Sequence, residues 1–183
     1  MGAAPDERPR GDPSPFTDAA GLVFLLHVAR DVELGRRIAA DARLAARPVR
    51  TVCHQLALAL VDVAPEDPAA LAFAGCGPDV DPPLPSPAFS PDEAQAVSEL
   101  RAAMVAGLAA RLDAAGIDLP HAEDPEAALG WVIRRRGEVV ADGGWIELRL
   151  PLDAVDTALR RAALDLHPDF VPWLAAVVRV VYV

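Results

Sequence analysis

The sequence has no lysine, and all 17 of its basic residues are arginine. These arginines stand against 27 acidic residues, which gives a formal net charge of −10. The excess of acid lies in residues 1–130, with 20 acids and 10 arginines, whereas residues 131–183 hold seven of each. Phosphate groups repel an acidic chain that lacks a basic stripe, so this composition disfavours binding to nucleic acid or to an anionic membrane surface.

Cysteine and histidine are scarce, which limits nucleophilic and metal chemistry. The two cysteines, Cys53 and Cys76, do not make a disulfide framework, and Cys53 lies in an apolar run typical of a small core residue. Cys53 and His54 are neighbours on an expected helix, so their side chains diverge by about 100° and do not readily share a ligand. A Cys–His catalytic pair assembled across the fold from His27 or His121 stays an alternative.

Long apolar runs and recognisable catalytic motifs are absent from the sequence. No run reaches the ~18–20 apolar residues of a membrane helix, and residues 1–15 lack the apolar segment of a secretory signal. There is no glycine-rich phosphate loop, no nucleophile elbow and no HExxH motif. We therefore expect a cytoplasmic, non-enzymatic protein without a cofactor or a metal, whose residues 1–15 form a disordered lead-in.

Proline, by contrast, is abundant, and it divides the chain. Six of the 18 prolines fall within residues 77–91. Such a segment has polyproline character, so we expect residues 77–89 to be a semi-rigid surface linker, with binding to an aromatic groove as the less common alternative. The linker separates a helical part, residues 16–76, from a second part, residues 90–183.

Helical patterns dominate the first two thirds of the chain. Before the linker we expect a buried helix with Thr17 as its N-cap, a short helix ending near Leu44, and a third over Val49 to Val63. After the linker, Ser90-Pro91-Asp92-Glu93 is a full capping-box signature, followed by an amphipathic stripe. Gly116 is the expected C-cap of that long helix, and residues 117–128 are expected to form a polar loop.

The last third of the sequence changes from helical period to a period of two. Val132 to Val140 reads as an extended segment, Asp142-Gly143-Gly144 as a hairpin turn, and residues 145–150 as the return strand. A helix capped by Asp153 and a terminal strand over residues 177–183 complete a β-β-α-β unit. The predicted class is therefore α+β. Both faces of the terminal strand are apolar, so we expect it to be covered on both sides or to lie at an interface.

Two polar clusters and three tryptophans are candidate sites. Asp165, His167 and Asp169 alternate and could face one metal in an extended segment, but Pro168 favours a turn, so we expect a structural role. The run of arginines at 134–136 is expected at a solvated edge or in ion pairs with the acidic N-terminal half, with an acidic protein partner as the alternative. The candidate partner contacts are Arg134, Arg136, Trp145, Phe170 and Trp173.

Three segments of the C-terminal third carry a family resemblance. They are residues 145–153, residues 160–166 and the Val171-Pro172-Trp173-Leu174 run. Together they resemble the tails of uncharacterised bacterial proteins encoded in clusters for phage-tail-like extracellular contractile injection systems, whose loop reads "GLDxDPGW-PWLG". Residues 21–26 are similar to the "GLFYLL" helix start of those proteins. This chain departs from the pattern at Ala163, Asp169 and Ala175, where the family has glycine, and at His167, where it has aspartate.

The resemblance covers about a third of the chain and implies an association with the injection apparatus, but no reaction. We therefore expect an accessory, structural or assembly component that contacts other proteins. The alternative is a small enzyme or ligand-binding protein with its site between the helical part and the C-terminal sheet. An exposed apolar or Trp-bearing patch favours the first, and a concave apolar pocket with convergent polar groups favours the second.

Overall fold

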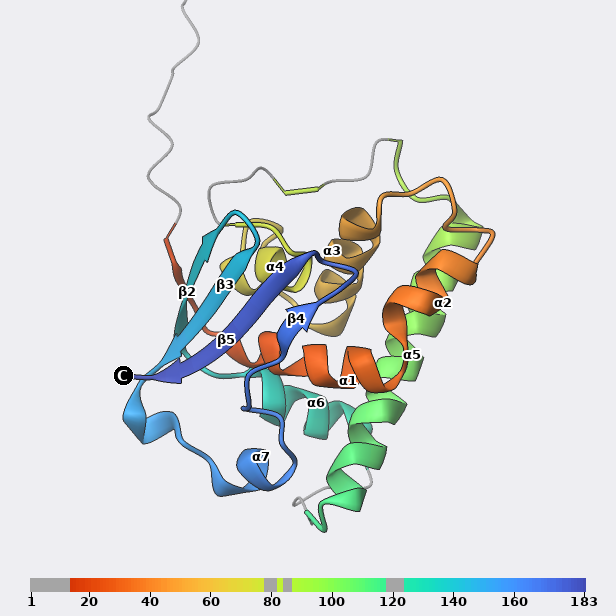
Figure 1. Ribbon diagram of the computed structural model, residues 1–183. Helices are drawn as coiled ribbons and strands as arrows, with labels where there is room; N and C mark the ends of the chain where they lie inside the picture. The colour runs from red at the N-terminus through yellow and green to blue at the C-terminus, as the bar shows by residue number, and fades with distance from the viewer. Residues whose placement is uncertain (1–13, 78–81, 84–86, 118–123) are drawn as a thin grey trace, which may run out of the picture.

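The predicted α+β class is confirmed in the computed structural model, which describes residues 14–77, 82–83, 87–117 and 124–183 (Figure 1). Seven helices occur within these residues: α1 (Leu25–Asp31), α2 (Leu34–Ala40), α3 (Val49–Leu60), α4 (Pro68–Phe73), α5 (Pro91–Ala114), α6 (Pro125–Ile133) and α7 (Thr157–Arg161). The strands are β1 (Phe16–Thr17), β2 (Gly137–Asp142), β3 (Trp145–Leu150), β4 (Asp169–Val171) and β5 (Ala176–Tyr182). No helix in the described part of the chain is both long and apolar enough to cross a membrane.

The five strands form one mixed sheet in the order β1-β2-β3-β5-β4. The predicted hairpin joins β2 and β3, and Gly144 takes the positive φ, 85°, that its turn needs. The terminal strand β5 runs parallel to β3 and antiparallel to β4. A parallel pair needs a long crossover, and here it contains the 3₁₀ turn η2 (Leu152–Ala154), α7 and β4.

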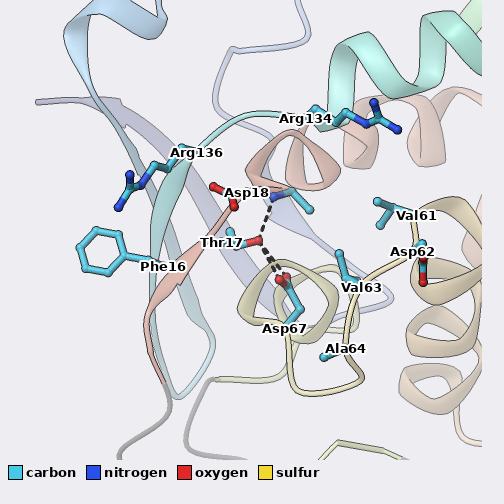
Figure 2. Close-up of a pocket in the computed structure, with 11 residues that line it drawn as sticks. Phe16, Thr17, Asp18, Val61, Asp62, Val63, Ala64, Asp67, Arg134 and Arg136 are labelled. Carbon is cyan, nitrogen blue, oxygen red and sulfur yellow. Dashed lines mark hydrogen bonds between the residues drawn. The ribbon is translucent and has the colours of Figure 1, made fainter.

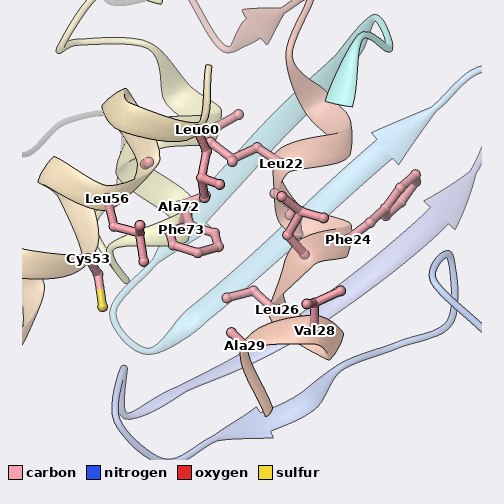
Figure 3. Close-up of a cluster of buried hydrophobic side chains, with 14 of the residues drawn as sticks. Leu22, Phe24, Leu26, Val28, Ala29, Cys53, Leu56, Leu60, Ala72 and Phe73 are labelled. Carbon is pink, nitrogen blue, oxygen red and sulfur yellow. The ribbon is translucent and has the colours of Figure 1, made fainter. Parts of the chain in front are cut away.

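A single apolar core joins the helical part to the sheet. Its largest fully buried side chains include Phe24 and Leu22 from the η1–α1 segment and Phe73 from α4 (Figure 3). The 3₁₀ helix η1 (Ala20–Phe24) runs directly into α1. One face of the sheet faces this core, with the buried residues Val139, Ile146, Leu148, Leu150, Val178 and Val180. Figure 1 shows the helices gathered on that side of the sheet.

The capping box of α5 forms as predicted. The Ser90 hydroxyl accepts from the Glu93 N–H (3.3 Å), and the Glu93 carboxylate accepts from the Ser90 N–H (2.6 Å). Arg47 also pairs with Glu93 at 2.6 Å and holds the pKa of that carboxyl at about 2. The same guanidinium donates to the carbonyls of Pro87 and Ala88, which ties the end of the proline-rich segment to the helical part. Residues 78–81 and 84–86 of the predicted linker lie outside the described residues.

Two sequence-based boundaries are wrong at the start of the chain and before β2. Thr17 is not a helix N-cap but part of β1, because its hydroxyl donates to Asp67 (2.8 Å) and accepts from the Ala19 N–H instead of capping the helix. The stretch predicted as loop and then strand contains α6. Asp124 accepts from the Glu126 N–H, and Pro125 occupies the first turn, so the Asp-Pro-Glu signal starts a helix there.

The arginine run is therefore not part of a strand. Arg134 is the C-cap of α6, and Arg135 forms an isolated bridge with Ala19. The side chain of Arg135 pairs with Asp156 at 3.2 Å, so this ion pair lies in the C-terminal half and not in the N-terminal half. Arg134 and Arg136 are exposed to solvent, which was the other expectation for the run. Asp156, and not Asp153, caps α7. These shifts leave the order of β2, β3, α7 and β5 as predicted and add the short strands β1 and β4.

Candidate interaction surface

The outer face of the sheet, opposite the helices, carries a row of exposed apolar side chains. Trp145 on β3 is the Cα partner of Val177 on β5, and Val177 is the partner of Phe170 on β4. Partners on adjacent strands project to the same side of a sheet, so the three side chains form one continuous row. Phe170 is 56% exposed and Trp145 38%, while Val177 is half-buried between them. We call this set the aromatic row.

Next to the aromatic row lies a band of charges that pair among themselves. Arg149 donates to Glu147 at 2.7 Å and lies 3.6 Å from Glu138, which is its partner on β2. These carboxylates raise the pKa of Arg149. The Arg179 guanidinium stacks on the Trp145 ring, 5.0 Å from its centroid. The two acids and two arginines of this band therefore cancel one another, on a chain that carries −10.

Only one face of β5 is fully buried, which corrects the expectation of a strand covered on both sides. Val178 and Val180 lie in the core, whereas Val181 is half-buried and Arg179 and Val183 are exposed on the outer side. The other expectation for this strand, that it lies at an interface, stays a prediction.

Side chains cover the edges of the sheet beside β5 and β4. The Val180 N–H, which lies beyond the reach of β4, donates to His167 Nδ1 at 3.1 Å. Arg30 of α1 donates to the carbonyls of Pro168 and Phe170 along β4. These side chains occupy several of the backbone groups that another strand would pair with, which favours the sheet face over this edge as the surface offered to a partner.

The loop from 162 to 170 is held by basic side chains of α1 and α5. Arg111 donates to the carbonyls of Ala162 and Ala163, and His27 Nε2 lies 3.0 Å from the carbonyl oxygen of Leu166. Burial lowers the pKa of His27, helped by the charges of Arg111 and Arg30. A neutral imidazole that donates from Nε2 fits this contact.

The residues of the possible metal cluster point to different partners. Asp165 is buried and accepts from Arg160 and from the Tyr182 hydroxyl (2.9 Å). Burial and this contact raise the pKa of Tyr182 to about 12. His167 accepts from the β5 backbone, and Asp169 is exposed. The described residues contain no group of three His, Cys, Asp or Glu side chains placed to hold a metal ion.

A groove lies beside β1, between the helical part and the start of β2 (Figure 2). This groove has a volume of about 960 Å³ and is lined by the arginines at 134 and 136, by Asp18 and Asp62, and by Asp67, which accepts from Thr17. In Figure 2 the two guanidinium groups lie on opposite sides of the groove and point apart. The polar groups therefore do not converge on one point.

The other candidates are buried or half-buried. Trp173, predicted as a partner contact, is half-buried and packs over α2, where a Cβ on Gly35 would meet its side chain at 2.9 Å. Cys53 is fully buried in α3, and burial raises the pKa of its thiol to about 12. His54 Nε2 contacts the carbonyl oxygen of Pro65 at 2.8 Å. Neither side chain of the Cys53–His54 pair is placed as a nucleophile with its base.

No protein-family model matches the chain, and comparison with curated proteins and with solved structures finds no match either. The site is therefore interpreted from its own geometry. Of the five predicted partner contacts, Trp145 and Phe170 fall together in the aromatic row, and Arg134 and Arg136 line the groove.

Proposed function

We propose that this protein is a non-enzymatic, cytoplasmic interaction component that acts in the assembly of a phage-tail-like contractile injection particle. The observation that carries the proposal is the aromatic row beside a charge-neutral band on an otherwise acidic molecule. An exposed apolar patch with aromatic residues is typical of a protein contact surface. Because the charges of the band already pair within the face, a partner does not need to supply counter-charges.

Backbone geometry supports the link to injection systems. Three non-glycine residues with positive φ, Ala163 (53°), Asp169 (58°) and Ala175 (51°), occupy the three positions where the family pattern has glycine. Glycine adopts this conformation without the steric cost that a Cβ brings. The loop of this chain thus has the shape that the glycines of the pattern favour, although its side chains differ.

The second candidate is ligand binding in the groove beside β1. The position of the groove favours it, because the groove lies between the two parts of the chain, as this alternative requires. Its two arginines are also exposed and form no ion pair with any residue that the structure describes. The divergence of those arginines and the acids around them make this the weaker candidate.

Co-expression with the tail components of the particle tests both functions. We expect that omitting this protein lowers the yield of assembled particles, counted by electron microscopy, and that a Trp145→Glu/Phe170→Glu variant behaves like the omission. Val155→Glu is the matched control, because Val155 is 49% exposed but lies outside the sheet. Full assembly without the protein contradicts the proposal. If Arg134→Gln/Arg136→Gln loses assembly while Trp145→Glu/Phe170→Glu still assembles particles, the result favours ligand binding in the groove.

A further inference from the structure

The outer residues of β3 form a charge pattern that complements itself when reversed. Along the strand they are Trp145, Glu147, Arg149 and then Pro151, which reads as apolar, acidic, basic, apolar. Beside them on β5 lie Val177, Arg179, Val181 and Val183. Val183 continues the ladder, since its N–H donates to the carbonyl of Leu150 and its carbonyl accepts from the N–H of Leu152. Over β3 and β5 the face thus has apolar rows at both ends and charges in the middle.

From this pattern we infer that the outer face binds the same face of a second copy of this chain. The inference rests on the proposed function, in which this face is a contact surface, and it names the partner. A two-fold axis between the two sheets, running across the strands, reverses the order of the rows. Each Glu147 then faces the second copy's Arg149, and the Trp145 end of each copy covers the Pro151–Val183 end of the other.

Electrostatics favour self-association through this face over contact through the acidic surfaces. Two molecules with a net charge of −10 repel each other, and that repulsion opposes contact through acidic surfaces. The middle rows of the outer face oppose contact less, because Glu138, Glu147, Arg149 and Arg179 cancel one another there. Face-to-face packing also leaves the arginine and histidine contacts at the sheet edge intact, since these lie beside β4 and β5 and not over them.

The size of the face sets the expected strength. Four rows on four strands make a footprint of about 20 by 20 Å, given about 3.3 Å per residue and about 4.8 Å between strands. A standard interface buries about 800 Å² of accessible surface on each partner, so this contact lies at the small end. We therefore expect a reversible dimer whose population depends on concentration in the micromolar range or above.

Two charge-reversal variants test the inference by sedimentation equilibrium of the full chain from about 1 to about 500 μM. The unaltered protein should show a monomer–dimer equilibrium. Glu147→Arg and Arg149→Glu should each raise the dimer Kd at least about tenfold, because like charges then face each other. Mixed in equal amounts, the two variants should form a heterodimer of near-normal affinity, since the introduced base of one chain faces acids of the other.

The mixture separates the interface from effects within one chain. Each variant keeps its own like-charged pair at 147 and 149, so mixing restores dimers only through contacts between chains. A protein that stays monomeric up to the highest concentration, or variants that are not rescued by mixing, overturns the inference. The proposed function is judged separately: a monomeric protein whose Trp145→Glu/Phe170→Glu variant still blocks particle assembly has a different partner on this face.

Discussion

The two faces of the sheet are built from the same strands but from different chemistry. The inner face is largely apolar, with Leu148 and Val178 fully buried against the helices. The outer face, one residue away along each strand, carries aromatic, aliphatic and charged side chains, of which Trp145 and Arg179 remain exposed. Because successive residues point to opposite sides, neighbouring positions serve separate roles. The inner residues stabilise the fold, and the outer residues are free to determine contacts.

Substitutions at two adjacent residues of β5 should show the largest difference in stability between the two faces. Val180→Asp places a charge in the core, where burial of a valine is worth about 1.5–3 kcal/mol and an unpaired charge costs more, so we expect loss of soluble folded protein. Arg179→Ser, on the outer side, should lower the free energy of unfolding by no more than about 1 kcal/mol. Urea unfolding followed by circular dichroism measures both. Equal losses in the two variants would show that the faces are not distinct.

The sequence predicted the parts of this fold that local patterns encode. The capping box at Ser90 and the glycine turn at Gly144 need only a few neighbouring residues, and both form as expected. The edge strand β1 was missed because it has only two residues and pairs with β2 about 120 positions away, so no local period marks it. The helix α6 was missed although Asp124-Pro125-Glu126 carries a start signal like that of α5.

The candidate surface was predicted in part for the same reason. Trp145 and Phe170 were named as partner contacts, but only the strand register shows that Val177 joins them into one row. The stacking of Arg179 on Trp145 also depends on the parallel pairing of β3 and β5, which no local pattern encodes. Trp173 is a tryptophan in the same third of the sequence as Trp145, but it packs closely against Gly35 of α2 and is half-buried.

Tyr182 tests how the end of β5 is anchored to the inner side. Its hydroxyl donates to the buried Asp165, whose carboxylate also pairs with Arg160. Tyr182→Phe removes that hydrogen bond while keeping the ring, so we expect the free energy of unfolding at pH 7 to fall by about 1.5–3 kcal/mol, as for a hydrogen bond to a charged group. Urea titration gives the change. Arg160→Gln serves as a comparison, and an unchanged stability in Tyr182→Phe would mean that solvent or Arg160 satisfies Asp165 alone.

Acidification tests the tie between the helices and the loop that precedes β4. The pKa of His27 is lowered from 6.5 by burial, with Arg111 and Arg30 adding to the shift, and with the hydrogen bond to the Leu166 carbonyl and the charge of Asp31 opposing it. Below pH 6.5 the unfolded chain therefore binds a proton that the folded chain rejects, and stability falls until the folded pKa is passed. The slope should reach at most about 1.4 kcal/mol per pH unit for this one proton.

His27→Gln is the control for that slope, because its amide can still donate to the Leu166 carbonyl but does not titrate. We expect the variant to lose the His27 share of the pH dependence between pH 6.5 and the onset of carboxylate protonation. An identical pH profile in the two proteins would show that His27 titrates in the same range folded and unfolded.

The smallest change in stability is expected at the turn between β4 and β5. Ala175 lies between β4 and β5, and with φ at 51° it fixes the register that places Phe170 beside Val177. A left-handed conformation costs a non-glycine residue about 1–2 kcal/mol, and the greater flexibility of glycine offsets about 0.5–1 kcal/mol of the relief. Ala175→Gly should therefore stabilise the fold by about 0.5–1 kcal/mol. Ala102→Gly, at an exposed site within α5, should instead cost about 1 kcal/mol. The opposite signs matter more than the sizes: if both variants lose stability, the turn does not hold Ala175 at positive φ, and the aromatic row loses the register on which the proposed contact depends.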